Sequence, residues 1–303
     1  MDPKATSPAR SVPPRQRTPT PKAMAPAVPF FLPLLLVAPA ALLLLLLALA
    51  FLVRPRPVRV PIRGRHVFIT GGSSGIGLAL AKRAAVEGAR VSILARSLRK
   101  LEEARDEIHR ATGVEVAVYS ADVRDEAAVR KAVDDAGPVD VLVCNHGVFV
   151  PQEMEAQSME DIRFMVDVNL MGTFHLVKAA LPGMKRGGGG PRSIAFMSSQ
   201  AGQSRRRPEV TNKIAGSSVG MKAEDVAKKA LNGIKSGSFI VPCNFDGLML
   251  SIATAGLSPQ RSYLMALVEV VGGGLLRFVA LCFQWGWYCT IEKCRPVKQK
   301  IRD

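Results

Sequence analysis

The stretch HVFITGGSSGIG, residues 66–77, constrains the fold of this chain more than any other part of the sequence. Residues suited to a buried strand run directly into a glycine-rich turn, and a helical pattern begins at residue 76. Glycines permit a tight turn and let the backbone approach a pyrophosphate, while a helix N-terminus favours its negative charge. The order strand, glycine turn, helix therefore predicts a dinucleotide-binding site. Its candidate cofactor contacts are Gly71, Ser73, Ser74, Gly75, Ile76 and Gly77.

Strand and helix patterns alternate from this turn as far as residue 199. The expected strands are 66–70, 89–96, 114–123, 139–147 and 193–199. The expected helices are 76–87, 98–111, 125–136 and 158–185. Such alternation predicts an α/β fold of the Rossmann type, with a doubly wound parallel sheet, over residues 64–245. The last part of this domain has an amphipathic helix at 222–237 and a strand-like run at 238–245.

Basic residues follow the second expected strand, where an acidic residue would hold the ribose 2′-hydroxyl of NAD. The sequence there is LARSLRK, which supplies Arg96, Arg99 and Lys100. Cations at this point favour the 2′-phosphate of NADP, so Arg96 and Lys100 are candidate cofactor contacts. The alternative is that these residues are solvated charges on the next helix.

The third and fourth strands also end in polar residues. Asp122, followed by Val123, is placed to hydrogen-bond the adenine edge, although it is equally suited to cap the next helix. Asn145 and Gly147 end the fourth strand and are expected to contact the cofactor. Between them, His146 is interpreted as a packing residue on the cofactor side rather than a catalyst.

The basic charge of the chain is concentrated around one apolar segment. Of the net charge of +16, residues 1–65 contribute +9, from ten Lys and Arg and one acid. Residues 1–26 read as a disordered basic tail and 27–53 as a transmembrane anchor, since about 20 apolar residues span a bilayer. A cleaved signal peptide, with ALA before Phe51, is the alternative. The pattern fits membrane flanks and not a nucleic-acid groove.

The C-terminal part, 246–303, is predicted to be an apolar membrane-associated or cap segment with a basic tail. Its core, 263–290, is strongly apolar but contains Glu269 and Arg277. A helical hairpin packed on the domain is the alternative. The five cysteines lack zinc-site spacing and are odd in number, so we expect reduced thiols, no disulfide and no metal site.

Several motifs over residues 64–203 together resemble the short-chain dehydrogenase/reductase family. These are TGGSSGIG, AD, NHG (usually with Ala in the middle), VDVNLMG and FMSSQAG. The resemblance implies that Ser198 or Ser199 polarises a carbonyl and that Asn169 completes a proton relay. It also implies a tyrosine as proton donor and a lysine four residues later that lowers the tyrosine pKa.

The N-terminal anchor and the run GSFIVPCNFDGLMLSIATAGLSPQRS are similar to the membrane-anchored reductases of sphingoid-base synthesis. That similarity implies NADPH-dependent reduction of a long-chain sphingoid ketone, 3-ketodihydrosphingosine, to dihydrosphingosine. It places the enzyme in the endoplasmic reticulum membrane with a cytosolic catalytic domain, and leaves a homo-oligomer open. One alternative is a membrane-bound reductase of steroid or retinoid type. Another is a catalytically dead, truncated regulator that binds cofactor or a partner.

The catalytic tyrosine and lysine of the family are missing from this sequence. The tyrosine belongs near position 212, which is Asn212, and the chain has only Tyr119, Tyr263 and Tyr288. None has a lysine four residues later. A βαβ unit takes roughly 30 residues, so the stretch 203–221 is too short for the tyrosine helix and a sixth strand. We therefore predict an internal deletion near Gln203–Ser204 and an inactive or nearly inactive polypeptide.

Overall fold

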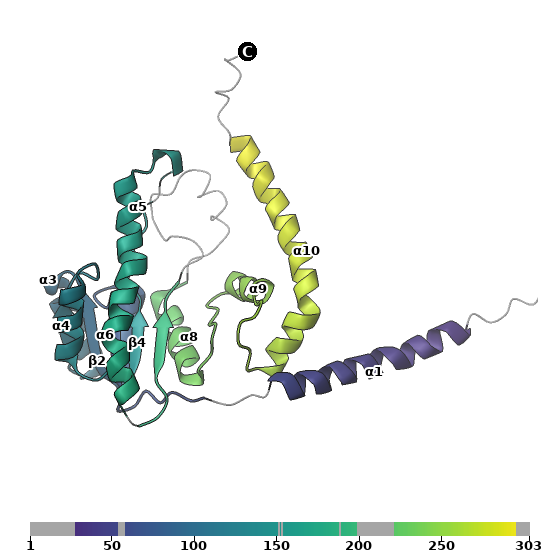
Figure 1. Cartoon of the computed structure of the whole chain (residues 1–303), viewed down its shortest axis with the longest axis horizontal. Helices are drawn as coiled ribbons and strands as arrows, with labels where there is room; N and C mark the ends of the chain where they lie inside the picture. The colour runs from purple at the N-terminus through teal and green to yellow at the C-terminus, as the bar shows by residue number, and fades with distance from the viewer. Residues whose placement is uncertain are drawn as a thin grey trace, which may run out of the picture. The chain divides into compact units, whose positions relative to one another are not determined.

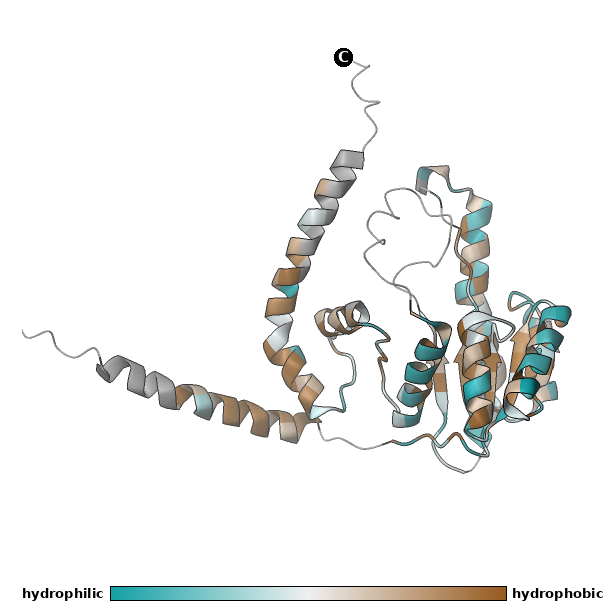
Figure 2. Cartoon of the chain, turned by 180° about the vertical axis from the view of Figure 1, so that it is seen from behind, coloured by the Kyte–Doolittle hydropathy of each residue, from teal (hydrophilic) through white to brown (hydrophobic). Residues whose placement is uncertain are grey.

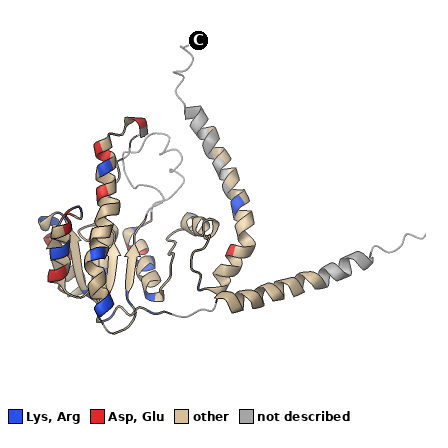
Figure 3. Ribbon diagram, in the orientation of Figure 1, with Lys and Arg blue, Asp and Glu red and all other residues tan. Residues whose placement is uncertain are grey.

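The computed structural model describes residues 28–53, 58–150, 152, 154–187, 189–198 and 221–294. The chain divides into two compact units, Met1–Ala48 and Leu49–Asp303. Helix α1, Val28–Val53, is 26 residues long and has no charged residue (Figures 2 and 3). Within the described side chains of this helix, Val37–Val53 is apolar but shorter than the about 20 residues that a bilayer crossing takes. The anchor over 27–53 stays a prediction.

A five-stranded parallel sheet forms the centre of the second unit (Figure 1). The strands are β1 (His66–Thr70), β2 (Arg90–Ala95), β3 (Ala117–Ser120), β4 (Val141–Cys144) and β5 (Ser193–Phe196). Their order is β3-β2-β1-β4-β5. Because the order reverses direction at β1, the sheet is doubly wound, which confirms the predicted fold class. The third and fourth strands are shorter than the expected 114–123 and 139–147, since their flanking residues form loops.

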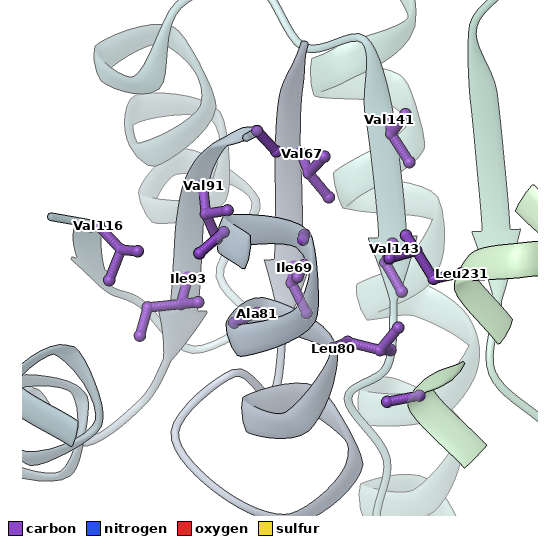
Figure 4. Close-up of a cluster of buried hydrophobic side chains, with 14 of the residues drawn as sticks. Val67, Ile69, Leu80, Ala81, Val91, Ile93, Val116, Val141, Val143 and Leu231 are labelled. Carbon is purple, nitrogen blue, oxygen red and sulfur yellow. The ribbon is translucent and has the colours of Figure 1, made fainter. Parts of the chain in front are cut away.

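Helices cover both faces of this sheet. Their bounds are α2 (Gly75–Val86), α3 (Leu98–Thr112), α4 (Glu126–Ala136), α5 (Met159–Val166), α6 (Gly172–Arg186) and α8 (Ala223–Ser236). On one face α2, α3 and α8 bury an apolar cluster that includes Val67, Ile69, Leu80 and Leu231 (Figure 4). On the other face α4 and α6 enclose a second cluster around Phe68. These two clusters hold the carboxyl edge of the sheet in place.

The strand expected at 238–245 does not form. Residues 238–244 have no regular structure, and helix α9 spans Phe245–Ala253. The side chains of Phe239 and Ile240 are 67% and 43% exposed. A strand needs a neighbour for its backbone hydrogen bonds, and β5 ends the sheet within the described residues. The prediction was wrong because the run is apolar and β-branched, but the sheet formed by the described residues offers it no partner strand.

The apolar C-terminal segment forms one long helix, α10, from Tyr263 to Cys294. It packs against α9. The membrane-associated or cap role of this segment, and the alternative of a helical hairpin packed on the domain, both stay predictions. Near its start the side chain of Gln260 donates a hydrogen bond to Glu269, at 2.7 Å. This bond gives the acidic residue of an otherwise apolar helix a polar partner.

One helical stretch in the described residues is long and apolar enough to cross a membrane by length and composition alone, Met159–Arg186. It comprises α5, the π-helical turn η2 (Asp167–Met171) and α6. Leu176, Ala180 and Met184 on this stretch are buried in the second core cluster. We therefore interpret this stretch as a helix that packs on the sheet and not as a membrane span.

A buried histidine links the amino-terminal ends of the strands. The ring of His66 bonds the Ser92 hydroxyl and the Pro138 carbonyl, both at 2.8 Å. Burial lowers the pKa of His66 below its ordinary value of 6.5, and the nearby Arg90 guanidinium lowers it further. The unfolded chain binds the proton on His66 more readily than the folded chain does. The contribution of neutral His66 to the free energy of unfolding is therefore fully present above about pH 6.5 and is lost as the pH falls below that value.

We expect His66→Asn to flatten this pH dependence and to cost about 1–3 kcal/mol at pH 7, since it removes buried hydrogen bonds. Urea unfolding at pH 7 and pH 5.5 measures both effects. His109→Asn is the matched control, because His109 is half-exposed and pairs only with Glu115. Equal pH dependence in the wild type and His66→Asn would show that His66 is not the titrating group.

Candidate active site

The glycine turn after β1 adopts the backbone that its sequence predicts. Gly71 and Gly75 have φ of +63° and +57°, in the left-handed region that favours glycine. A Cβ on Gly77 would lie 2.2 Å from the Gly71 carbonyl oxygen. A Cβ on Gly75 would meet nothing within 4 Å, so open space lies beside the backbone where α2 begins. This cradle fits the pyrophosphate of a dinucleotide.

The other candidate residues of the turn surround this cradle. Ser74 precedes α2 but its side chain makes no capping bond within the described residues. Ser73 is half-buried, and Ile76 packs against the apolar cluster under α2. The turn therefore offers backbone N–H groups and two serine hydroxyls to a ligand.

We expect Gly77→Ala to weaken dinucleotide binding at least about tenfold, because overpacking at a tight backbone contact shifts the turn. Fluorescence titration with NADPH measures the loss. Gly183→Ala is the matched control, since a Cβ at that helical position meets nothing within 4 Å. Unchanged affinity in Gly77→Ala would mean that the turn does not hold the cofactor.

The end of β4 packs directly against this turn. The Asn145 amide donates to the Thr70 carbonyl at 3.2 Å and approaches the Gly71 carbonyl at 3.5 Å. The backbone N–H of Asn145 donates to the Thr70 hydroxyl at 3.0 Å. Our sequence reasoning overlooked Thr70, although a threonine that ends a buried strand before a glycine turn was a usable signal. It joins β1 and β4 at the carboxyl edge.

Asn169 lies in the π-helical turn η2, where one continuous helix was expected. Its side-chain oxygen accepts from the Val148 backbone N–H, and its amide donates to the Val148 carbonyl, both at 2.8 Å. A Cβ on Gly147 would lie 3.4 Å from the Asn169 side-chain oxygen. Single π-turns are frequent at functional sites. The structure thus brings Asn145, Gly147 and Asn169 together.

Ser198 follows β5 at the same edge of the sheet. The Met197 N–H donates to the Cys144 carbonyl at 2.9 Å, and Ser198 itself is exposed. Ser199 lies outside the described residues. Of the tyrosines, Tyr119 stacks on the buried Phe68 with ring centroids 5.9 Å apart, and Tyr263 begins α10. Neither of these two is placed to act as proton donor beside Ser198.

Asp122 is engaged by a neighbouring cation. The Arg124 guanidinium donates to both carboxylate oxygens, at 2.7–3.2 Å, and this contact holds the pKa of Asp122 below its ordinary value. The alternative role as helix cap was wrong, because Asp125 caps α4 by accepting from the Ala128 N–H. Val123 is buried beside it. An adenine ring that bonds Asp122 has to share this carboxylate with Arg124.

The three basic residues after β2 differ in their surroundings. Arg99 forms an ion pair with Glu103 on the same helix. Arg96 and Lys100 are exposed, and neither has a salt bridge among the described residues. Ser97 caps α3 by accepting from the Lys100 backbone N–H. Lys100 therefore lies in the first turn of the helix. Arg96 and Lys100 are therefore the cations available to an anion at the end of β2.

Comparison with known proteins gives a family match over the sheet domain and relatives that match most of the chain. The family model described as short chain dehydrogenase matches residues 65–211. The 3-dehydrosphinganine reductase TSC10A of Arabidopsis thaliana is 50% identical, over 82% of this chain and 92% of that protein.

The chain belongs to the short chain dehydrogenase family. TSC10B of the same plant is also 50% identical, over 80% of this chain and 89% of its own length. The 3-dehydrosphinganine reductase of Danio rerio is 28% identical, over 83% and 92%. The chain is thus an oxidoreductase by family, with the site architecture for a nicotinamide dinucleotide.

Proposed function

We propose that this chain descends from an NADPH-dependent reductase that converts 3-ketodihydrosphingosine to dihydrosphingosine in sphingolipid synthesis. The observation that carries the proposal is 50% identity to a plant 3-dehydrosphinganine reductase over 92% of its length. The site supports it, because the glycine turn, Asn145, Asn169 and Ser198 gather at one sheet edge. When bound, the dinucleotide supplies the hydride. The role proposed for Ser198 or Ser199 is to polarise the ketone oxygen.

NADPH rather than NADH is proposed as the cofactor because of the cations after β2. Arg96 and Lys100 lie at the strand end where the adenosine ribose of a dinucleotide sits in this fold. A 2′-phosphate carries negative charge, and exposed cations without ion pairs are suited to bind it. Asp122 and Val123 are the proposed contacts for the adenine edge.

As written, the chain is proposed to lack a helix–strand unit between Gln203 and Ser204. The alignment with TSC10A spans 300 positions, but 82% of 303 residues is about 248, so about 52 positions have no counterpart here. For TSC10B, 80% is about 242 residues of 295 positions, which leaves about 53. A shortfall of this size exceeds the roughly 30 residues of a βαβ unit.

Two features of the fold support the proposal that a helix–strand unit is missing. Strand β5 ends the described sheet, and the apolar run 238–244 has no strand partner and exposes Phe239 and Ile240. One further strand beside β5 would give that run a neighbour. The absent unit would also carry the tyrosine and lysine, so we propose that the chain as written has little or no reductase activity.

The missing tyrosine and lysine favour one second candidate, a catalytically dead regulator that keeps the cofactor site or binds a full-length partner. Detection of this chain beside a full-length form in the same cells, bound to it in a pull-down, supports the regulator. Absence of any such chain in cells excludes it.

Membrane attachment is proposed for α1 and α10, with the endoplasmic reticulum as the membrane and the sheet on the cytosolic side. The uncharged α1 and the apolar surface of α10 suit a long-chain substrate that stays in the bilayer (Figure 2). Protease protection of the chain in microsomes tests this orientation. Digestion of the sheet domain without detergent is the expected result.

A substrate panel tests the proposed reaction. The chain with the absent unit restored is assayed with NADPH and 3-ketodihydrosphingosine, a 3-ketosteroid, or retinal. We expect turnover of the sphingoid ketone at least about a hundredfold faster than the others, since a pocket shaped for one chain discriminates at the transition state. Preference for the steroid or retinal would replace the sphingoid assignment with the alternative reductase class.

A further inference from the structure

The ring of His146 bridges the cofactor turn and the helix that carries Asn169. Its Nδ1 lies 2.8 Å from the Thr70 hydroxyl oxygen at the end of β1. Its Nε2 lies 3.3 Å from the hydroxyl oxygen of Thr173 in α6. The Thr173 hydroxyl in turn donates to the Asn169 carbonyl at 2.8 Å. Four polar groups, from β1, the segment after β4, α6 and η2, therefore form one chain of hydrogen bonds.

Counting protons fixes the direction of this chain. The Thr70 hydroxyl oxygen accepts the backbone N–H groups of Asn145 and His146, at 3.0 and 3.2 Å, which uses both of its lone pairs. It cannot accept a third proton from the imidazole. The hydroxyl has one proton, and His146 Nδ1 at 2.8 Å is nearer than its other acceptor, the Val143 carbonyl at 3.3 Å. His146 Nδ1 is therefore the bare, accepting nitrogen.

The rest of the chain follows from this tautomer. A neutral imidazole with bare Nδ1 carries its proton on Nε2, which the Thr173 hydroxyl, at 3.3 Å, and the Val168 backbone carbonyl share. The Thr173 proton is used on the Asn169 carbonyl. Burial lowers the pKa of His146, and a hydrogen bond with the Val168 backbone opposes this only in part. The ring is thus neutral at physiological pH.

We propose that His146 is a positioning residue that fixes the π-turn of Asn169 against the cofactor turn. The resemblance to the family predicts alanine at this place, and a methyl group cannot make either bond. The imidazole links the Thr70 hydroxyl, at the end of β1, to the Thr173 hydroxyl, which bonds the Asn169 carbonyl. It acts on the nicotinamide side of the site, whereas the adenine side rests on Arg96 and Asp122.

Selective ¹⁵N-histidine labelling of the full chain in micelles tests the tautomer. The chain has only four histidines, so the ring nitrogens are assignable by single substitution. We expect His146 to show an unprotonated Nδ1 and a protonated Nε2 at pH 7. The opposite tautomer, or a charged ring at that pH, would overturn the proposal.

Ligand binding and amide exchange test the positioning role. His146→Ala and Thr173→Val are each expected to raise the NADPH dissociation constant about fivefold, because each breaks the hydrogen-bond chain at the ring and a net loss of this size is typical of a broken hydrogen bond. Exchange of the Val148 amide, which donates to Asn169, is expected to rise by a similar factor. Binding of adenosine 2′,5′-bisphosphate, a probe of the adenine side alone, is expected to stay unchanged.

Matched variants separate positioning from general damage. Thr173→Ser keeps the hydroxyl and is expected to behave as the wild type, and exposed His109→Ala is expected to change nothing. The double variant His146→Ala/Thr173→Val is expected to lose no more than either single change, because both break the same chain. Equal weakening of both nucleotide probes would assign His146 a merely structural role and overturn the proposal.

The nucleotide readout rests on the proposed NADP specificity, and the experiment distinguishes the two failures. If adenosine 2′,5′-bisphosphate does not bind the wild type, the cofactor assignment fails. The tautomer and the Val148 exchange rate then decide the positioning role by themselves. A correct tautomer with unchanged Val148 exchange in His146→Ala would contradict that role.

Discussion

Insertion, between Gln203 and Ser204, of the unit of about 52 residues that is proposed to be absent is expected to raise NADPH-dependent reduction of 3-ketodihydrosphingosine at least about a thousandfold over the chain as written. A positioned general acid contributes about 10²–10⁴-fold by itself. We propose that the insert supplies both the acid and a lysine that lowers its pKa, since an unperturbed tyrosine has a pKa near 10. Product formation measured by mass spectrometry gives the ratio.

Two variants of the restored chain separate chemistry from folding. Tyrosine to phenylalanine and lysine to methionine within the insert keep its shape and remove the acid and its partner. Both are expected to bind NADPH and to fall to near the rate of the short chain. If the short chain and the restored chain turn over equally fast, the catalytic group lies elsewhere and the account of this site is wrong.

Replacement of Arg96 and Lys100 together by alanine is expected to weaken NADPH binding about a hundredfold and to leave NADH binding within about twofold. Hydrogen bonds to charged groups are worth about 1.5–3 kcal/mol each, and the low end of that range applies to exposed side chains, so the loss of two gives a factor of this order. The effect is expected to shrink as salt rises, because both side chains are exposed. Fluorescence titration with the two dinucleotides measures it.

Arg99→Ala is the control for this pair. Arg99 lies beside Lys100 in the first turn of α3, and Arg99→Ala removes one positive charge where the double variant removes two, but the Arg99 guanidinium is already paired with Glu103. It is expected to change NADPH binding by less than about threefold, as exposed ion pairs contribute little. Equal losses in Arg99→Ala and in the double variant would indicate a diffuse charge effect and not a 2′-phosphate site.

The parts of the fold that local sequence dictates were predicted well. The strand His66–Thr70 was placed to the residue, because a buried run that ends in a glycine turn has few alternatives. The π-turn at Asn169 was not predicted, since it depends on a contact between that side chain and the Val148 backbone 21 residues away. Helix periodicity carries no information on such a contact.

The errors share a physical cause, which is dependence on partners far along the chain. The run 238–245 has strand composition, but strand formation needs a neighbour that the described sheet does not provide. Asp122 has the composition of a cap, but Arg124 binds its carboxylate and Asp125 takes the capping position. The interpretation of His146 as a packing residue rather than a catalyst stays a prediction, and its hydrogen bonds appear only when β1 and α6 are brought together.

Sequencing full-length transcripts across the codons for Gln203 and Ser204 tests the central claim most directly, that a catalytic helix–strand unit is absent at one junction of a reductase chain. The account predicts messages with an in-frame insert of about 52 codons at that junction, encoding a tyrosine and a lysine four residues apart. A gene whose every message joins these two codons directly would contradict it.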